Sequence, residues 1–185
     1  MYETMEELKD VAINCNRCKL STGRKNIVFG VGNENADIMF IGEGPGADED
    51  TQGIPFVGKA GQLMNKAFDV VGIEREEVYI ANIVKCRPPN NRDPEQDEVL
   101  SCINYLRNQV MIVKPKIIVL LGRISLQNIL GKEYKITASI IIRVEKKGIL
   151  YMPTCHPAAL RIDETKKIDF IRDLKEVINK LNDMT

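Results

Sequence analysis

The chain has 185 residues, and its 26 lysine and arginine residues balance 26 aspartate and glutamate residues. This length suits one domain, residues 1–185, and the zero net charge excludes a strong overall basic field, so any contact with nucleic acid has to come from a local patch. No apolar stretch approaches the roughly 20 residues of a membrane span, and the acidic N-terminus lacks the basic and apolar parts of a signal peptide. We therefore expect a cytoplasmic protein that does not enter a membrane.

Residues 3–13 predict a short helix, because apolar side chains recur there at helical spacing. The helix leads into a C-x2-C-x67-C-x15-C pattern, formed by Cys15, Cys18, Cys86 and Cys102. Disulfides are rare in a reducing compartment, and four thiolates can close a tetrahedral site for an iron–sulfur cluster or for structural zinc. The competing interpretation makes Cys86 and Cys102 apolar fillers of the core. Cys155 falls outside the pattern.

A buried strand followed by a glycine-rich turn is the next feature. Residues 38–41 are a continuous apolar run, which predicts a strand of a parallel sheet covered on both faces. The turn Gly-Glu-Gly-Pro-Gly at 42–46 lets the backbone approach a ligand closely, although glycines alone also fit a plain tight turn. Glu43 and the carboxylates at 48–50 are too many for a phosphate cradle, so we expect a ligand that is not recognised mainly as an anion.

A helix and a second strand follow. Apolar residues at helical spacing predict a crossover helix over residues 59–72, ended by Gly72. Residues 78–84 predict the second strand, and Asn82 stands toward its carboxyl end, where open α/β sheets bind ligands. Tying down a loop is the other role open to a buried asparagine.

Prolines make residues 85–94 an irregular loop. Asp93 is the expected N-cap of a helix that begins at Pro94, and the inner face of that helix carries Cys102. A third strand over residues 116–122 and a short helix over residues 124–130 come next.

The last part of the chain predicts a hairpin and a helix. Residues 137–144 and 148–152 are rich in β-forming residues and are separated by a short polar turn, and residues 166–181 predict the final helix. His156, the one histidine, lies between them. A lone histidine is more often structural, but Pro157 fixes this one at a strand-to-loop junction, which favours a functional role.

Six motifs in order resemble family 4, the iron–sulfur uracil-DNA glycosylases, a group named for thermophile enzymes. The resemblance runs from about Cys15 to the final helix. The motifs are Gly-Glu-Gly-Pro-Gly at 42–46, Pro-Phe-Val-Gly at 55–58, Asn82, Cys-Arg-Pro-Pro at 86–89, Asn-Arg-Asp-Pro at 91–94 and His-Pro-Ala at 156–158. The resemblance implies a three-layer α/β/α fold with a central, mostly parallel, four-stranded sheet.

The resemblance also implies an activity and a cofactor. The protein would be a monomer that flips uracil out of DNA and hydrolyses its N-glycosidic bond, and a structural [4Fe–4S] cluster would be held by Cys15, Cys18, Cys86 and Cys102. The uracil pocket would be lined by Glu43, Gly44, Pro45, Phe56, Asn82 and His156. The alternatives are a non-catalytic nucleic-acid-binding module stapled by a metal, and a glycosylase for another deaminated base.

Each pocket residue is expected to have its own role. Phe56 would stack on the flipped base, and Asn82 would read the O4 and N3–H edge of uracil. Neutral His156 would donate to uracil O2, where negative charge grows as the bond breaks. By the same resemblance, Glu49 would exclude the methyl group of thymine. Candidate contacts to the DNA backbone are Lys59, Arg87, Arg92, Arg123, Arg143 and Arg161.

The chain departs from related sequences at three points. Cys155 stands where many relatives carry an aromatic residue before the histidine. No strongly basic insertion flanks His156, which argues against the branch that crosslinks to DNA. Gly44 stands where some glycosylase families place a water-orienting aspartate, which leaves that role to Glu43 or to bound water.

Overall fold

The computed structural model of the chain describes residues 1–137 and 142–185. Six strands among the described residues form one sheet in the order β1-β3-β2-β4-β6-β5. They are β1 (Val31–Gly32), β2 (Ile38–Gly42), β3 (Tyr79–Asn82), β4 (Ile117–Leu121), β5 (Val144–Lys146) and β6 (Ile149–Thr154). The central four run parallel, as expected, and β1 and β5 pair antiparallel at the two edges. The edge strand β1 was missed because two residues are too few to show a pattern.

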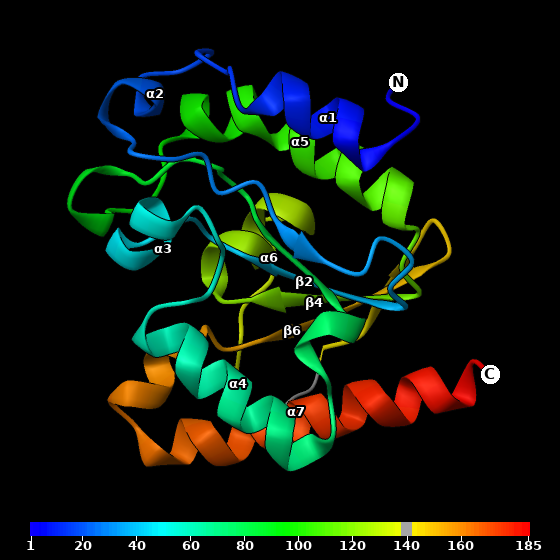
Figure 1. Ribbon diagram of the computed structural model, residues 1–185. Helices are drawn as coiled ribbons and strands as arrows, with labels where there is room; N and C mark the ends of the chain where they lie inside the picture. The colour runs from blue at the N-terminus through cyan, green and yellow to red at the C-terminus, as the bar shows by residue number, and fades with distance from the viewer. Residues whose placement is uncertain (138–141) are drawn as a thin grey trace.

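Helices cover both faces of this sheet, which confirms the three-layer architecture (Figure 1). On one face lie α1 (Met5–Ala12) and α5 (Gln96–Val113), and on the other lie α4 (Lys59–Val71) and α7 (Glu164–Asp183). Successive side chains of β2 enter opposite cores, since Met39 packs with Leu8 and Leu106 whereas Phe40 packs with Phe68. An apolar run without alternation is therefore what this strand requires.

The shorter elements connect these layers. They are the helices α2 (Leu20–Gly23), α3 (Ala47–Gln52) and α6 (Arg123–Ile129), and the 3₁₀ helices η1 (Arg75–Glu77), η2 (Pro89–Asn91) and η3 (Pro157–Arg161). Gly72 ends α4 in the left-handed conformation (φ 78°), as expected from its position in the sequence. Among the described residues, no helix is both long enough and apolar enough to cross a membrane.

The expected start of the helix after the proline-rich loop was wrong by two residues. Helix α5 begins at Gln96 rather than Pro94, because Glu95 caps it and its own N–H donates to the buried carboxylate of Glu98 over 2.8 Å. Asp93 does not cap the helix; it pairs with Arg123 instead, with 2.7 Å between Oδ2 and Nη2.

The hairpin of β5 and β6 is confirmed, with its turn two residues later than expected. Glu145 and Lys146 belong to β5, and the turn consists of Lys147 (φ 53°) and Gly148 (φ 77°). Two positive φ values are what the twist of a tight hairpin favours. The first strand was expected over residues 137–144, of which 138–141 lie outside the described residues.

Candidate functional site

The carboxyl ends of the parallel strands bring the candidate residues to one edge of the sheet. Asn82 ends β3 and pairs in register with Gly42 at the end of β2, so Glu43 lies beside it. Thr154, which ends β6, pairs with Leu121 and places His156 just beyond the same edge. One pocket at this edge is lined by all seven candidates, namely Glu43, Gly44, Pro45, Glu49, Phe56, Asn82 and His156.

Phe56 and Asn82 meet over Gly42. A Cβ built on Gly42 would lie 2.5 Å from Asn82 Oδ1 and 2.5 Å from Phe56 Cζ, so only glycine leaves room for both side chains. The Phe56 ring also lies 5.7 Å from the His156 ring, measured between centroids. The benzyl, carboxamide and imidazole groups are therefore close enough together to surround one small ring.

Asn82 has a buried polar atom that lacks a partner. Its side chain is 2% exposed, and its Oδ1 accepts no hydrogen bond within the described part of the chain. Leaving a buried acceptor unpaired costs about 1–3 kcal/mol, so native structures rarely tolerate it without a reason. An incoming N–H donor would satisfy this oxygen.

His156 is held in one tautomer. Its Nδ1 accepts the N–H of Ala158 over 3.0 Å, so a neutral ring carries its proton on Nε2. Burial lowers the pKa of His156 to about 4, and the Glu49 carboxylate opposes this shift only in part. At neutral pH the imidazole is therefore an uncharged donor.

Gly122 is a site residue that sequence reasoning did not identify. It follows β4 with φ 89°, and a Cβ on it would lie 2.9 Å from the Cβ of His156. The sequence marked Gly122 only as the end of a strand. Its contact with the histidine joins positions that are far apart in the chain, so no local pattern could have shown it.

Glu43 and Glu49 differ in how their carboxylates are used. Burial raises the pKa of Glu43 to about 7; Asp93 adds to the shift and Arg123 opposes it. Glu49 instead accepts the N–H groups of Gly46, Val57 and Gly58 over 3.2, 3.2 and 3.0 Å. Glu49 thus ties the glycine-rich turn to the loop of Phe56, whereas Glu43 is available to act as an acid or a base.

The six cations proposed for the DNA backbone do not form one group. Lys59, Arg92 and Arg161 line the pocket, but Arg92 holds the buried Glu98 carboxylate with two hydrogen bonds of 2.9 and 2.6 Å. The remaining three have local partners: Arg87 with Asn91, Arg123 with Asp93 and Arg143 with Glu176. Only Lys59 and Arg161 line the pocket without an ion-pair partner among the described residues.

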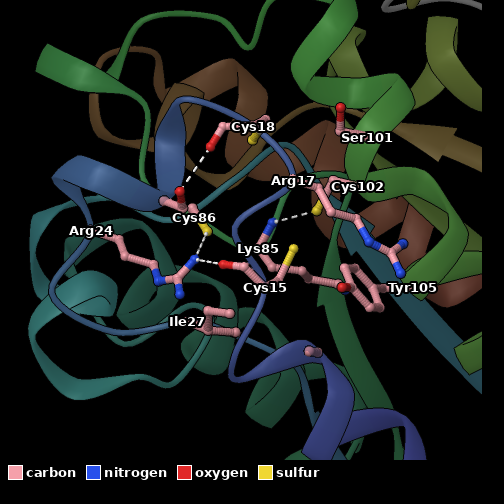
Figure 2. A pocket seen from close by; sticks show the side chains of 12 residues that line it. Cys15, Arg17, Cys18, Arg24, Ile27, Lys85, Cys86, Ser101, Cys102 and Tyr105 are labelled. Carbon is pink, nitrogen blue, oxygen red and sulfur yellow. Dashed lines mark hydrogen bonds between the residues drawn. The ribbon is translucent and has the colours of Figure 1, made fainter.

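The four cysteines of the C-x2-C-x67-C-x15-C pattern line a second pocket, on the face covered by α1 and α5 (Figure 2). N–H donors point at two of the sulfur atoms: Arg24 Nη1 lies 3.5 Å from Cys86 Sγ, and the N–H of Lys85 lies 3.3 Å from Cys102 Sγ. Burial raises the pKa of Cys102 to about 11. Within the described residues, no three His, Cys, Asp or Glu side chains converge closely enough to hold a single metal ion.

Lys85 lines the cysteine pocket and contacts Asn82, which lines the other pocket. Its side chain is 1% exposed, and its Nζ donates to the main-chain oxygen of Asn82 over 3.1 Å and to Gln109 Oε1 over 2.6 Å. Cys155 is half-buried in the core beneath α7 and does not line the cysteine pocket.

An α/β sheet with a small-ligand pocket at the carboxyl ends of its parallel strands defines a broad class of enzymes. Within that class, residues 29–181 match the family model of the Uracil DNA glycosylase superfamily. The chain is 42% identical over 184 residues to the type-4 uracil-DNA glycosylase of Sulfurisphaera tokodaii, covering 95% of this chain and 84% of the relative. It is 46% identical over 167 residues to that of Saccharolobus solfataricus (85% and 77%) and 40% identical over 185 residues to that of Thermotoga maritima (96% and 96%). The chain belongs to the uracil-DNA glycosylase superfamily.

Proposed function

We propose that this chain excises uracil from DNA by hydrolysing the N-glycosidic bond, which leaves an abasic site for base excision repair. The observation that carries this proposal is the buried Oδ1 of Asn82, which no described residue pairs with, in a pocket shared with Phe56 and His156. The type-4 relatives support it. Because the target base is stacked inside a duplex, the nucleotide has to be flipped out to reach such a pocket.

Base recognition follows from the groups that line the pocket. Phe56 offers a face for stacking, worth about 1–3 kcal/mol for a base on an aromatic ring. Asn82 Oδ1 accepts the N3–H of uracil, and the amide nitrogen donates to O4. Cytosine has no hydrogen on N3 and carries an amine in place of O4, so it would leave the buried oxygen unpaired. Discrimination of this kind needs no contact with the sugar.

Catalysis requires stabilisation of the charge that grows on the departing uracil. The Nε2–H of neutral His156 is assigned to uracil O2, where it stabilises the anion without first giving up a proton. Glu43, with its pKa near 7, is assigned to orienting the attacking water and accepting its proton. Gly44 and Pro45 complete the turn against the base, and Glu49 holds that turn to the loop of Phe56. Glu49 also remains our candidate for excluding thymine at C5.

The four cysteines, which line one pocket, supply the thiolate ligands that a [4Fe–4S] cluster needs, and the resemblance to family 4 favours this cluster over zinc. N–H donors to sulfur, such as Arg24, also suit a cluster. When bound, the cluster would act structurally: Cys15, Cys18, Cys86 and Cys102 would join the N-terminal segment to α5 and to the loop after β3.

We assign Lys59 and Arg161, which line the pocket, to the DNA backbone. Loss of either should weaken binding and lower the salt slope by about one. We further propose that the protein acts as a monomer, since one chain supplies every residue of the pocket. Unpaired thiols are also compatible with the reducing cytoplasm, where we expect it to act.

A uracil-containing oligonucleotide treated first with the protein and then with alkali tests the function. Strand scission at the uracil position shows that an abasic site was made, and a matched oligonucleotide with thymine or cytosine at that position is the control. Retardation in a gel without scission would favour the non-catalytic binding module. Scission at hypoxanthine but not at uracil would favour the glycosylase for another deaminated base.

A further inference from the structure

Arg75 donates hydrogen bonds to the main chain of the loop that carries Phe56. The guanidinium donates from Nη2 to the main-chain oxygen of Pro55 over 2.5 Å and from Nη1 to that of Phe56 over 3.0 Å. Nη1 also donates to Asn65 Oδ1 on α4 over 2.9 Å, which fixes the orientation of the forked guanidinium group. Arg75 lies in η1, after α4, and does not line the pocket.

Phe56 has a backbone conformation that needs such support. Its φ is 52°, in the left-handed region, which is rare for an aromatic residue and persists only where the surroundings impose it. Strain of this kind concentrates at functional sites, and here it falls on the residue assigned to stacking.

Close packing on two sides restricts where the Phe56 ring can go. A Cβ on Gly61 of α4 would overlap the main-chain oxygen of Phe56, so this stretch is pressed against the helix. The ring is pressed against Gly42, and it lies 34° from the plane of the His156 ring. Arg75 supplies the remaining restraint, because its fork holds two successive carbonyl groups that would otherwise turn if φ relaxed.

The N–H groups of Arg75 donate to neutral oxygen atoms. No carboxylate lies within ion-pair distance of it among the described residues; burial lowers the pKa of its guanidinium, and the charge of the nearby Glu76 carboxylate opposes this shift. The hydrogen bonds to the main chain of the Phe56 loop are therefore what this partly buried arginine contributes. Lysine offers no planar fork and could reach one carbonyl at a time.

We propose that Arg75 is a positioning residue for uracil, which sets the stacking face of Phe56 without touching the base. This inference rests on the proposed function. Stacking acts on the bound base before and during bond cleavage. A misplaced Phe56 ring therefore weakens binding of the substrate and of the transition state alike. The expected signature is a higher KM with little change in the rate of the chemical step.

Free uracil binding and single-turnover kinetics of Arg75→Gln test this. We expect the dissociation constant for uracil and the half-saturating enzyme concentration to rise about tenfold, within the range that stacking supplies, while the maximal rate falls less than about threefold. Arg107→Gln is the matched control and should match wild type, because Arg107 is exposed on α5 and, in the described part of the chain, hydrogen-bonds only to Asn104.

A double-mutant cycle with Phe56→Ala separates positioning from general destabilisation. If Arg75 acts through the ring, Arg75→Gln causes no further loss of uracil affinity once the ring is gone. An equal loss in both backgrounds overturns the proposal, as does wild-type affinity in Arg75→Gln. If Arg75→Gln does not fold, Arg75→Lys and Asn65→Ala replace it, with smaller shifts expected in the same direction. A wild-type protein that releases no uracil would instead contradict the proposed function itself.

Discussion

The pocket at the strand ends and the pocket of the four cysteines are joined by one short stretch, residues 82–86, yet their polar groups are arranged differently. In the first pocket Asn82 Oδ1 has no partner among residues 1–137 and 142–185, and the pKa values of His156 and Glu43 are shifted toward the neutral forms. In the second, N–H donors already point at Cys86 and Cys102. We therefore propose that the first pocket takes an exchangeable ligand and that the second takes a permanently bound group.

Lys85 shows how the two pockets depend on each other. Its main-chain N–H reaches Cys102, and its ammonium group holds the main-chain oxygen of Asn82. In the stretch from Asn82 to Lys85, the N–H of Ile83 donates to the main-chain oxygen of Gly42, and the N–H of Val84 donates to that of Glu43. A group that fixes the cysteine loop should therefore also fix the backbone under the residues that we propose to read the base.

The largest effect is expected from Cys102→Ser. Losing a ligand of the proposed cluster should remove iron and cost more than about 4 kcal/mol of stability, which lowers Tm by about 10 °C or more at this chain length. Iron content, the visible absorbance of the cluster and thermal unfolding measure this. Cys155→Ser is the control and should keep its iron. A colourless wild-type protein with stoichiometric zinc would contradict the cluster.

His156→Ala should separate chemistry from stability. Removing the donor to O2 is expected to slow uracil release by at least about 10²-fold in single-turnover assays. Iron content and Tm should stay close to wild type, since the cysteine pocket is untouched. A rate near wild type would remove His156 from the proposed mechanism.

Asn82→Asp tests which groups read the base. A carboxylate can accept from the N4 amine of cytosine, so the variant should release cytosine from a cytosine-containing duplex and release uracil at least about tenfold more slowly. High-performance chromatography of the released bases measures both. Retained uracil specificity would show that another residue reads the Watson–Crick edge.

The pH dependence of the rate should report Glu43. A carboxyl group with a raised pKa loses its charge as pH falls, so the rate should drop about tenfold per pH unit below about 7 and level off above it. His156, with a pKa near 4, stays neutral over this range and adds no second slope. Glu43→Gln should be slow and independent of pH from 5 to 8; an unchanged slope in that variant would assign the titration to another group.

The smallest effect is expected from Gly122→Ala. A Cβ there would strain the backbone and push on His156, so we expect a rate loss of about tenfold or less with a modest fall in Tm. Gly23→Ala is the matched control, because a Cβ on Gly23 meets nothing within 4 Å. Equal rates for the two variants would show that Gly122 does not position the histidine.

The sequence predicted the features that depend on local patterns and motifs. Apolar runs and periodicity predicted individual strands and helices, whereas the four-stranded, three-layer fold and the seven pocket candidates came from the resemblance to family 4. Helix α5 began later than expected because the side chains of Glu95 and Glu98 outweighed the proline signal at Pro94.

Residues that act through distant contacts could not be predicted in this way. Arg75 donates to main-chain oxygens 19 and 20 residues earlier in the chain, and Gly122 leaves room for His156, which is also distant in the sequence. Lys85 was hidden for another reason: a lysine in a polar loop is expected at the surface, and only the fold shows that it is buried. The sequence also could not show which of the six candidate cations for DNA already have partners within the protein, as Arg92, Arg123 and Arg143 do.

Binding of free uracil and of 3-methyluracil, measured side by side by calorimetry, tests the role of Asn82 most directly. Methylation removes the N3–H that would satisfy the buried Oδ1 of Asn82 and places a methyl group against that oxygen. We predict that uracil binds, that 3-methyluracil binds at least about tenfold more weakly, and that Asn82→Ala loses this difference. Equal affinity of the wild-type protein for the two bases would contradict a pocket built around that oxygen.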